Sequence, residues 1–167
     1  SFDYGSSAKI YGGVVITLGT SDMAQNFTEA TQGSILVSTN GYFTAGTTLS
    51  LCDENGNVIL AFTSTKSFNG ALFSAPEIEK GKTYTFYTGA TVEGLDENGY
   101  AHNTTQTGGE SCGSITVDEL VCGQGAGAPG GMPGGPDGSG APTEYAAAVT
   151  ITEDSQGASY SSSAASE

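Results

Sequence analysis

The stretch Lys82-Thr83-Tyr84-Thr85-Phe86-Tyr87-Thr88 decides the fold class of this chain. Tyr84 and Phe86 alternate with threonines, and a period of two places apolar side chains on one face of a strand and polar side chains on the other. Aromatic and β-branched residues also favour strands. The stretch therefore predicts a strand with one buried face, and Tyr87, out of phase with Phe86, is expected to point away from the core.

Similar runs lie on both sides of this stretch, separated by Gly, Asn, Asp and Ser, which is the pattern of strands joined by turns. The sharpest turn signal is Asn55-Gly56, because these residues tolerate the positive φ angles of a tight hairpin. About seven strands in roughly 110 residues are typical of a sandwich. We therefore predict an all-β fold, an antiparallel β-sandwich with strands at 14–18, 34–38, 47–52, 58–63, 71–74, 83–88 and 114–121.

Residues 123–142 interrupt this pattern with nine glycines and four prolines. Such a composition buries too little apolar surface to offset the entropy lost on ordering, so a disordered Gly/Pro-rich linker is expected there. The linker divides the chain into four predicted parts: a short β-helix-like rung at 1–12, the sandwich at 13–122, the linker itself, and the start of a further β module at 143–167.

The charge of the chain restricts its partners. Eighteen acidic residues stand against four lysines, which gives a net charge of −14. This excludes nucleic acid as a partner, because binding to phosphate backbones needs clustered Lys and Arg. Neutral polysaccharide and calcium, a hard cation that prefers oxygen ligands, remain compatible with such a surface. No stretch approaches the roughly 20 apolar residues of a transmembrane helix, so no transmembrane segment is predicted.

The cysteines are odd in number, so Cys52, Cys112 and Cys122 can form at most one intramolecular disulfide. Their state is left open. We expect no bond between Cys112 and Cys122, because the stretch between them is predicted to be one extended strand that spans more than the roughly 7 Å limit between bridged Cα atoms.

Several segments carry a resemblance to a known family. Ser7-Ala8-Lys9-Ile10-Tyr11-Gly12-Gly13-Val14-Val15-Ile16 looks like the closing rung of a right-handed parallel β-helix, and the body that follows, with its hairpin at 53–57, resembles a companion small domain. The tail at 149–154 is similar to the opening of another β-helix. Together they resemble a clostridial-type family of cell-surface, carbohydrate-binding proteins whose β-helices look like those of polysaccharide lyases.

The resemblance implies a bacterial, extracellular, adhesin-like protein at the cell surface. Its expected partners are plant or cell-wall polysaccharides and neighbouring β-helix modules of the same protein or of other copies. In that family the calcium and glycan sites are expected on the long β-helix, so no functional residue of the family is carried onto this sequence.

Two motifs suggest chemistry. Gly109-Glu110-Ser111-Cys112-Gly113 matches the G-x-S-x-G pattern of a serine nucleophile, but no helical pattern follows it and His102 precedes it in the chain. Asp53, Asn55 and Asn57 match the start of a calcium loop, but Val58 replaces the required glycine, so a hairpin turn is the favoured interpretation and calcium the alternative.

Aromatic rings beside polar groups are the usual elements of sugar recognition, because a pyranose has an apolar face and a rim of hydroxyls. The candidates are Tyr42, Tyr87 and Tyr100, with Asn98 as a polar neighbour. The sequence therefore predicts a non-catalytic spacer or accessory module of a carbohydrate-binding surface protein. The alternatives are a direct glycan-binding module that uses exposed tyrosines and, with less support, a hydrolase that uses Ser111.

Overall fold

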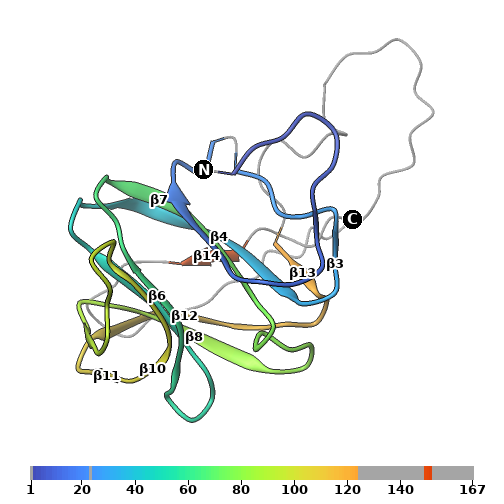
Figure 1. Cartoon of the computed structure of the whole chain (residues 1–167). Helices are drawn as coiled ribbons and strands as arrows, with labels where there is room; N and C mark the ends of the chain where they lie inside the picture. The colour runs from blue at the N-terminus through green and yellow to red at the C-terminus, as the bar shows by residue number, and fades with distance from the viewer. Residues whose placement is uncertain (1, 23, 124–148, 152–167) are drawn as a thin grey trace.

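The computed structural model describes residues 2–22, 24–123 and 149–151. Within these residues the protein is all-β, without a helix, and two sheets pack face to face as a sandwich (Figure 1). The predicted fold class is thereby confirmed. The predicted linker and most of the predicted C-terminal module lie outside the described residues.

The first sheet has five strands in the order β10-β6-β5-β8-β12, and all its neighbouring strands are antiparallel. Its strands are β5 (Thr48–Cys52), β6 (Val58–Thr63), β8 (Thr83–Thr88), β10 (Tyr100–Thr104) and β12 (Glu110–Thr116). The strand β10 was missed, because only Ala101 of its sequence is a buried apolar residue, 3% exposed, and one such residue makes no alternating pattern.

The second sheet has the order β13-β4-β7-β2, and β14 also pairs with β4. Its strands are β2 (Val15–Gly19), β4 (Gly33–Phe43), β7 (Phe68–Ala75), β13 (Val121–Cys122) and β14 (Val149–Ile151). The long strands β2, β7 and β4 are antiparallel, whereas β13 and β14 run parallel to β4. Short parallel strands thus complete one edge of an otherwise antiparallel sheet.

The core lies between the two sheets. The second sheet contributes Ile35 and Phe73, and the first contributes Leu51, Phe86 and others, all completely or almost completely buried. The rings of Phe73 and Phe86 meet edge to face across the interface, with centroids 5.5 Å apart. The alternation predicted for the 83–88 stretch is confirmed, because Phe86 is buried in the core and its neighbours are only half-buried.

The predicted single strand at 114–121 is wrong. The chain leaves the first sheet after Thr116, bends at 118–120, and enters the second sheet at Val121. Val117 sits at the crossing, fully buried, and its N–H donates to the Lys82 carbonyl at 2.9 Å. An apolar run that crosses from one sheet to the other looks in sequence like one continuous strand.

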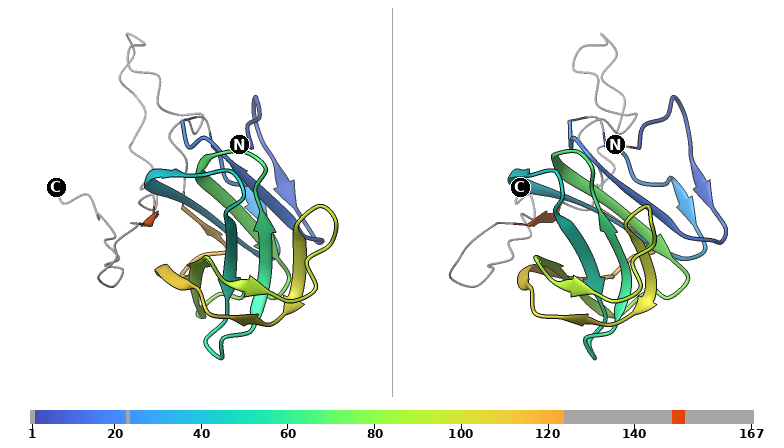
Figure 2. Two further views of the ribbon diagram at one scale, coloured as in Figure 1. Left: turned by 90° about the vertical axis from the view of Figure 1, so that its left-hand side faces the viewer. Right: turned by 60° about the vertical axis from the view of Figure 1, so that its left-hand side comes forward.

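The N-terminal segment packs on the outer face of the second sheet (Figure 2). There β1 (Lys9–Ile10) pairs in parallel with β3 (Glu29–Ala30), and Ile10 and Phe27 pack with Leu36 and Leu72 of the sheet. Residues 2–12 are therefore held to the sandwich by apolar contacts and by backbone hydrogen bonds such as Thr28 N–H to the Ala8 carbonyl at 2.8 Å.

A small two-stranded sheet covers part of the outer face of the first sheet. It consists of β9 (Thr91–Val92) and β11 (Gln106–Thr107), which are antiparallel. Val92 packs there with Cys52, Val58 and other residues. The Ser50 hydroxyl donates to Gln106 Oε1 at 2.5 Å, which ties this β9–β11 pair to the first sheet.

Candidate functional site

Loops gather at the two ends of the first sheet. Strand register places the Asp53–Asn57 hairpin at one end, where Cys52 pairs with both Val58 and Thr85. At the other end Thr48 pairs with Thr63 and Leu49 with Thr88. Each of these ends carries a pocket lined by described residues, and some of the candidate residues line them: Asp53 and Asn55 at the first end, and Tyr42 at the other.

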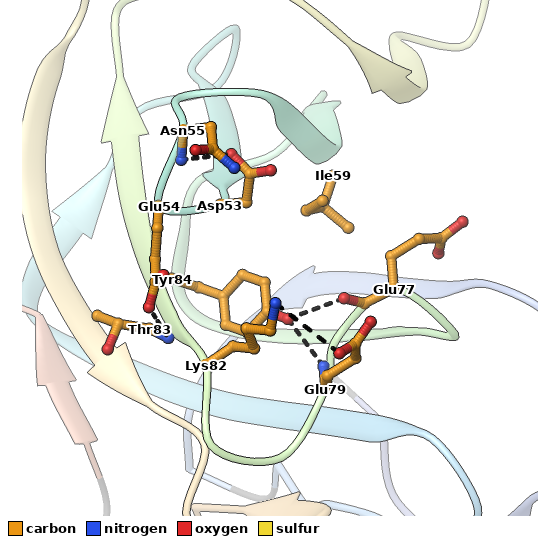
Figure 3. Close-up of a pocket in the computed structure, with 9 residues that line it drawn as sticks. All are labelled: Asp53, Glu54, Asn55, Ile59, Glu77, Glu79, Lys82, Thr83 and Tyr84. Atoms are coloured by element: carbon orange, nitrogen blue, oxygen red, sulfur yellow. Dashed lines mark hydrogen bonds and ion pairs between the residues drawn. The ribbon is translucent and has the colours of Figure 1, made fainter.

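The first pocket is acidic and encloses about 250 Å³. Figure 3 shows the Tyr84 ring between the hairpin that carries Asp53 and Asn55 and the turn that carries Glu77 and Glu79. The remaining lining residues are Glu54, Ile59, Lys82 and Thr83. Carboxylates that line a pocket suggest a cation site, so the partners of each carboxylate decide whether they are available.

The carboxylate of Asp53 is used by its own hairpin. Its Oδ1 accepts hydrogen bonds from the N–H groups of Asn55 and Asn57 at 2.9 and 2.8 Å, and Oδ2 accepts from Asn57 Nδ2 at 2.9 Å. Partial burial alone would raise the pKa of Asp53, but these hydrogen bonds outweigh it and hold the pKa below its usual value. The residues proposed for calcium, Asp53, Asn55 and Asn57, are thus committed to one another as a turn.

The other carboxylates of this pocket also have partners. Glu54 accepts the N–H of Thr83 at 3.2 Å, and Lys82 Nζ lies 4.0 Å from Glu79 (Figure 3). Glu77 Oε1 accepts from Asn103 Nδ2 at 2.8 Å and lies 3.2 Å from His102 Nε2. Among the described residues, no group of three or more His, Cys, Asp or Glu side chains is arranged to hold a metal ion. The acidic pocket is therefore a weak candidate for a cation site.

The second pocket is a larger groove of about 570 Å³ at the opposite end of the sheet. We call it the Tyr42 groove. Its lining comes from the end of β4, the start of β5 and the end of β8, and it contains no charged residue: Tyr42, Phe43, Thr44, Gly46, Thr47, Thr48, Thr88, Gly89 and Ala90. Four threonines supply hydroxyl groups, and Tyr42 is 56% exposed.

The structure separates the sequence-predicted glycan residues. Tyr87 lies on the outer face of the first sheet as expected, but it is half-buried against the cluster that includes Val92 of the β9–β11 pair. Tyr100 is half-buried against the main core. Asn98 is exposed in the turn at 96–100, where its N–H donates to Asp96 Oδ1 at 2.8 Å. Of the four candidates, only Tyr42 lines the groove.

The serine motif lies in a different setting from a nucleophile turn. Ser111 sits on β12 opposite Tyr87, followed by more strand instead of a helix. His102 is on β10, at the other edge of the same five-stranded sheet. Four strand spacings of about 4.8 Å separate the two edges, roughly 19 Å in total, which is far beyond hydrogen-bond reach. These two residues do not form a nucleophile and base pair.

Sequence reasoning missed two features. One is the set of threonines at 44, 47, 48 and 88, which come from separate segments and meet only in the fold. The other is a repeated turn: Asp96-Glu97-Asn98-Gly99 has the same sequence as Asp53-Glu54-Asn55-Gly56 and the same backbone hydrogen bonds. A search for internal repeats would have found the second feature.

Comparisons of the chain with family models, with curated proteins and with solved structures found no match. The described residues contain no helix that is long and apolar enough to cross a membrane.

Proposed function

We propose that this chain is a non-catalytic accessory module of an extracellular, cell-surface carbohydrate-binding protein, and that it binds polysaccharide in the Tyr42 groove. The observation that carries the proposal is the uncharged lining of this groove in a chain with a net charge of −14. An exposed aromatic ring lies there beside several hydroxyl groups.

The chemistry of a sugar explains why these features matter together. The apolar face of a pyranose packs on an aromatic ring, while its hydroxyl rim exchanges hydrogen bonds with polar side chains and backbone groups. Tyr42 is one of the two most exposed large apolar side chains in the described chain; the other is Tyr11, at 62%. Since one tyrosine supplies little contact area, we expect weak binding, with affinity in the full protein increased by neighbouring modules.

The test is titration of the full chain with soluble plant and cell-wall polysaccharides by calorimetry, in calcium and in a chelator. We expect weak binding to at least one neutral polymer, and Tyr42→Ala should weaken it about five- to thirtyfold, because a sugar stacked on an aromatic ring contributes on the order of 1–2 kcal/mol. Tyr11→Ala is the matched control, since it removes an exposed tyrosine outside the groove. Equal effects of the two variants would reject the groove, and a requirement for calcium would revive the metal interpretation of Asp53.

A spacer is the second candidate function. It is favoured by the half-buried positions of Tyr87 and Tyr100, which reduce the aromatic surface open to a ligand. It is also supported by the parallel β1–β3 pair, a geometry on which a neighbouring β-helix module can stack. No binding of the chain to any neutral or acidic polymer in the titration above would favour the spacer.

A further inference from the structure

We infer that Glu110 sets the ligand class of the Tyr42 groove, selecting neutral polysaccharides over polymers of uronic acids. The inference rests on the proposed function of the groove and adds its specificity. Glu110 is not among the lining residues, and it entered the sequence analysis only as the second residue of the serine motif.

The position of Glu110 follows from strand register. It lies directly opposite Thr88, a residue of the groove, in the antiparallel β8–β12 ladder. Opposite residues in such a ladder project from the same face, with Cβ atoms about 5 Å apart. The preceding residue, Gly109, has a φ of 91°, and a Cβ built on it would come within 2.7 Å of the Ala90 Cβ. The chain before Glu110 is therefore pressed against the groove wall.

The carboxylate of Glu110 is available to a ligand. Glu110 is exposed, and it has no ion pair or side-chain hydrogen bond to any other described residue. This sets it apart from the carboxylates of the acidic pocket, each of which has a partner. A carboxylate beside a sugar site accepts hydrogen bonds from hydroxyl groups, which neutral sugars supply. The same charge repels the carboxylate that every residue of a uronic acid polymer carries.

One cation competes with this effect. The loop that contains Lys66 is joined to the groove loop by hydrogen bonds, Gly46 N–H to the Ser64 carbonyl at 2.7 Å and Ser64 N–H to the Thr47 carbonyl at 3.1 Å. Lys66 is the one lysine of four without an ion pair to a described residue. However, Lys66 neither lines the groove nor pairs with a residue that does, and the net charge of −14 reinforces Glu110.

The experiment compares two polymers that differ mainly in charge, polygalacturonate and its methyl ester, together with the neutral polymers of the first titration. Full-length wild-type chain should bind neutral polymers and bind polygalacturonate more weakly than its ester. Glu110→Gln should raise the affinity for polygalacturonate about two- to fivefold at low salt, an effect that fades at about 0.5 M salt, and change neutral binding less than about twofold. Lys66→Gln should leave the ratio of the affinities for polygalacturonate and its ester, the acid-to-ester ratio, unchanged or lower it by less than about twofold.

The outcomes separate the two proposals. If Tyr42→Ala abolishes neutral binding but Glu110→Gln leaves the acid-to-ester ratio unchanged, the groove stands and the role of Glu110 is rejected. The inference would also be overturned if wild type bound polygalacturonate more tightly than the ester and Lys66→Gln lost this preference. Lys66 would then be the residue that recognises the carboxylate. Absence of binding to all neutral polymers would overturn the proposed function and this inference together.

Discussion

Replacement of Asn26 should strongly destabilise the protein, because its side chain is buried and joins two strands. Asn26 is 1% exposed. Its Nδ2 donates to the carbonyls of Ser34, Cys122 and Gly123 at 3.2, 2.8 and 3.0 Å. Its Oδ1 accepts from the N–H of Phe27 at 2.8 Å and from the Ser34 hydroxyl. One side chain thus joins the start of β4 to the end of β13.

The magnitude follows from these contacts. Each intramolecular hydrogen bond contributes about 0.5–1.5 kcal/mol net, and a buried polar group left without a partner costs about 1–3 kcal/mol. Because the two Nδ2 protons are shared among three carbonyls, these contributions are not additive, and we expect Asn26→Ala to lower the free energy of unfolding by about 3–4 kcal/mol. Asn26→Asp keeps the size of the side chain but turns an oxygen toward three carbonyl oxygens, so it should destabilise at least as much.

The assay is urea unfolding followed by circular dichroism. With a slope of about 1–3 kcal/mol per molar urea, Asn26→Ala should lower the midpoint by roughly 1–4 M. Asn57→Ala is the matched control, because Asn57 is exposed and its side chain donates one hydrogen bond, to Asp53 Oδ2 at 2.9 Å. It should cost less than about 1 kcal/mol.

The stability of Asn26→Asp relative to wild type tests whether the donated hydrogen bonds matter. If the aspartate variant is as stable as wild type at neutral pH, the donated hydrogen bonds are not what holds the site together. A cost for Asn26→Ala no larger than that of Asn57→Ala would likewise refute the assignment of Asn26 as a buried connection between the two strands.

Two further predictions concern ionisable groups. Hydrogen bonds from the N–H groups of Tyr100 and Asn98 hold the pKa of Asp96 below its usual value, so its contribution to stability is present above the unfolded pKa of about 3.9 and is lost as the pH falls through the folded pKa. The difference in Tm between wild type and Asp96→Ala should therefore be largest near neutral pH and vanish in strong acid; a difference that persists there would contradict this. Burial raises the pKa of the Cys52 thiol to about 11 and also raises that of Cys122, so a thiol reagent at about pH 8 should react slowly with the native protein. The denatured, unreduced protein should yield three thiols, since all three cysteines carry thiols in the structure, and mass spectrometry that finds a crosslink would overturn this.

The reason given for expecting no bond between Cys112 and Cys122 is wrong. Cys112 and Cys122 carry thiols in the structure. The extended strand that was expected to keep them apart does not exist, because the chain bends at 118–120 between them. Their separation depends on how two sheets are connected, a property that the stretch between them does not encode.

The sequence by itself determined the strand content and the turns. Tyr84 and Phe86 alternate with polar residues, and a period of two has one interpretation in a short segment, so β8 was predicted with the bounds that the structure shows. Asn55-Gly56 predicted a hairpin, because the positive φ of 84° at Gly56 is a local requirement of the backbone. Both signals are local, and local signals survive without knowledge of the rest of the chain.

Only the tertiary structure decided which tyrosine is available and what lies beside it. Tyr42, Tyr87 and Tyr100 look alike in sequence, yet only Tyr42 is left uncovered, because the β9–β11 pair packs beside Tyr87 and the core packs beside Tyr100. The groove itself joins residues 42–48 to residues 88–90. Such a site depends on strand order and register between segments distant in the chain, and the residue pattern within any one segment carries no information about either.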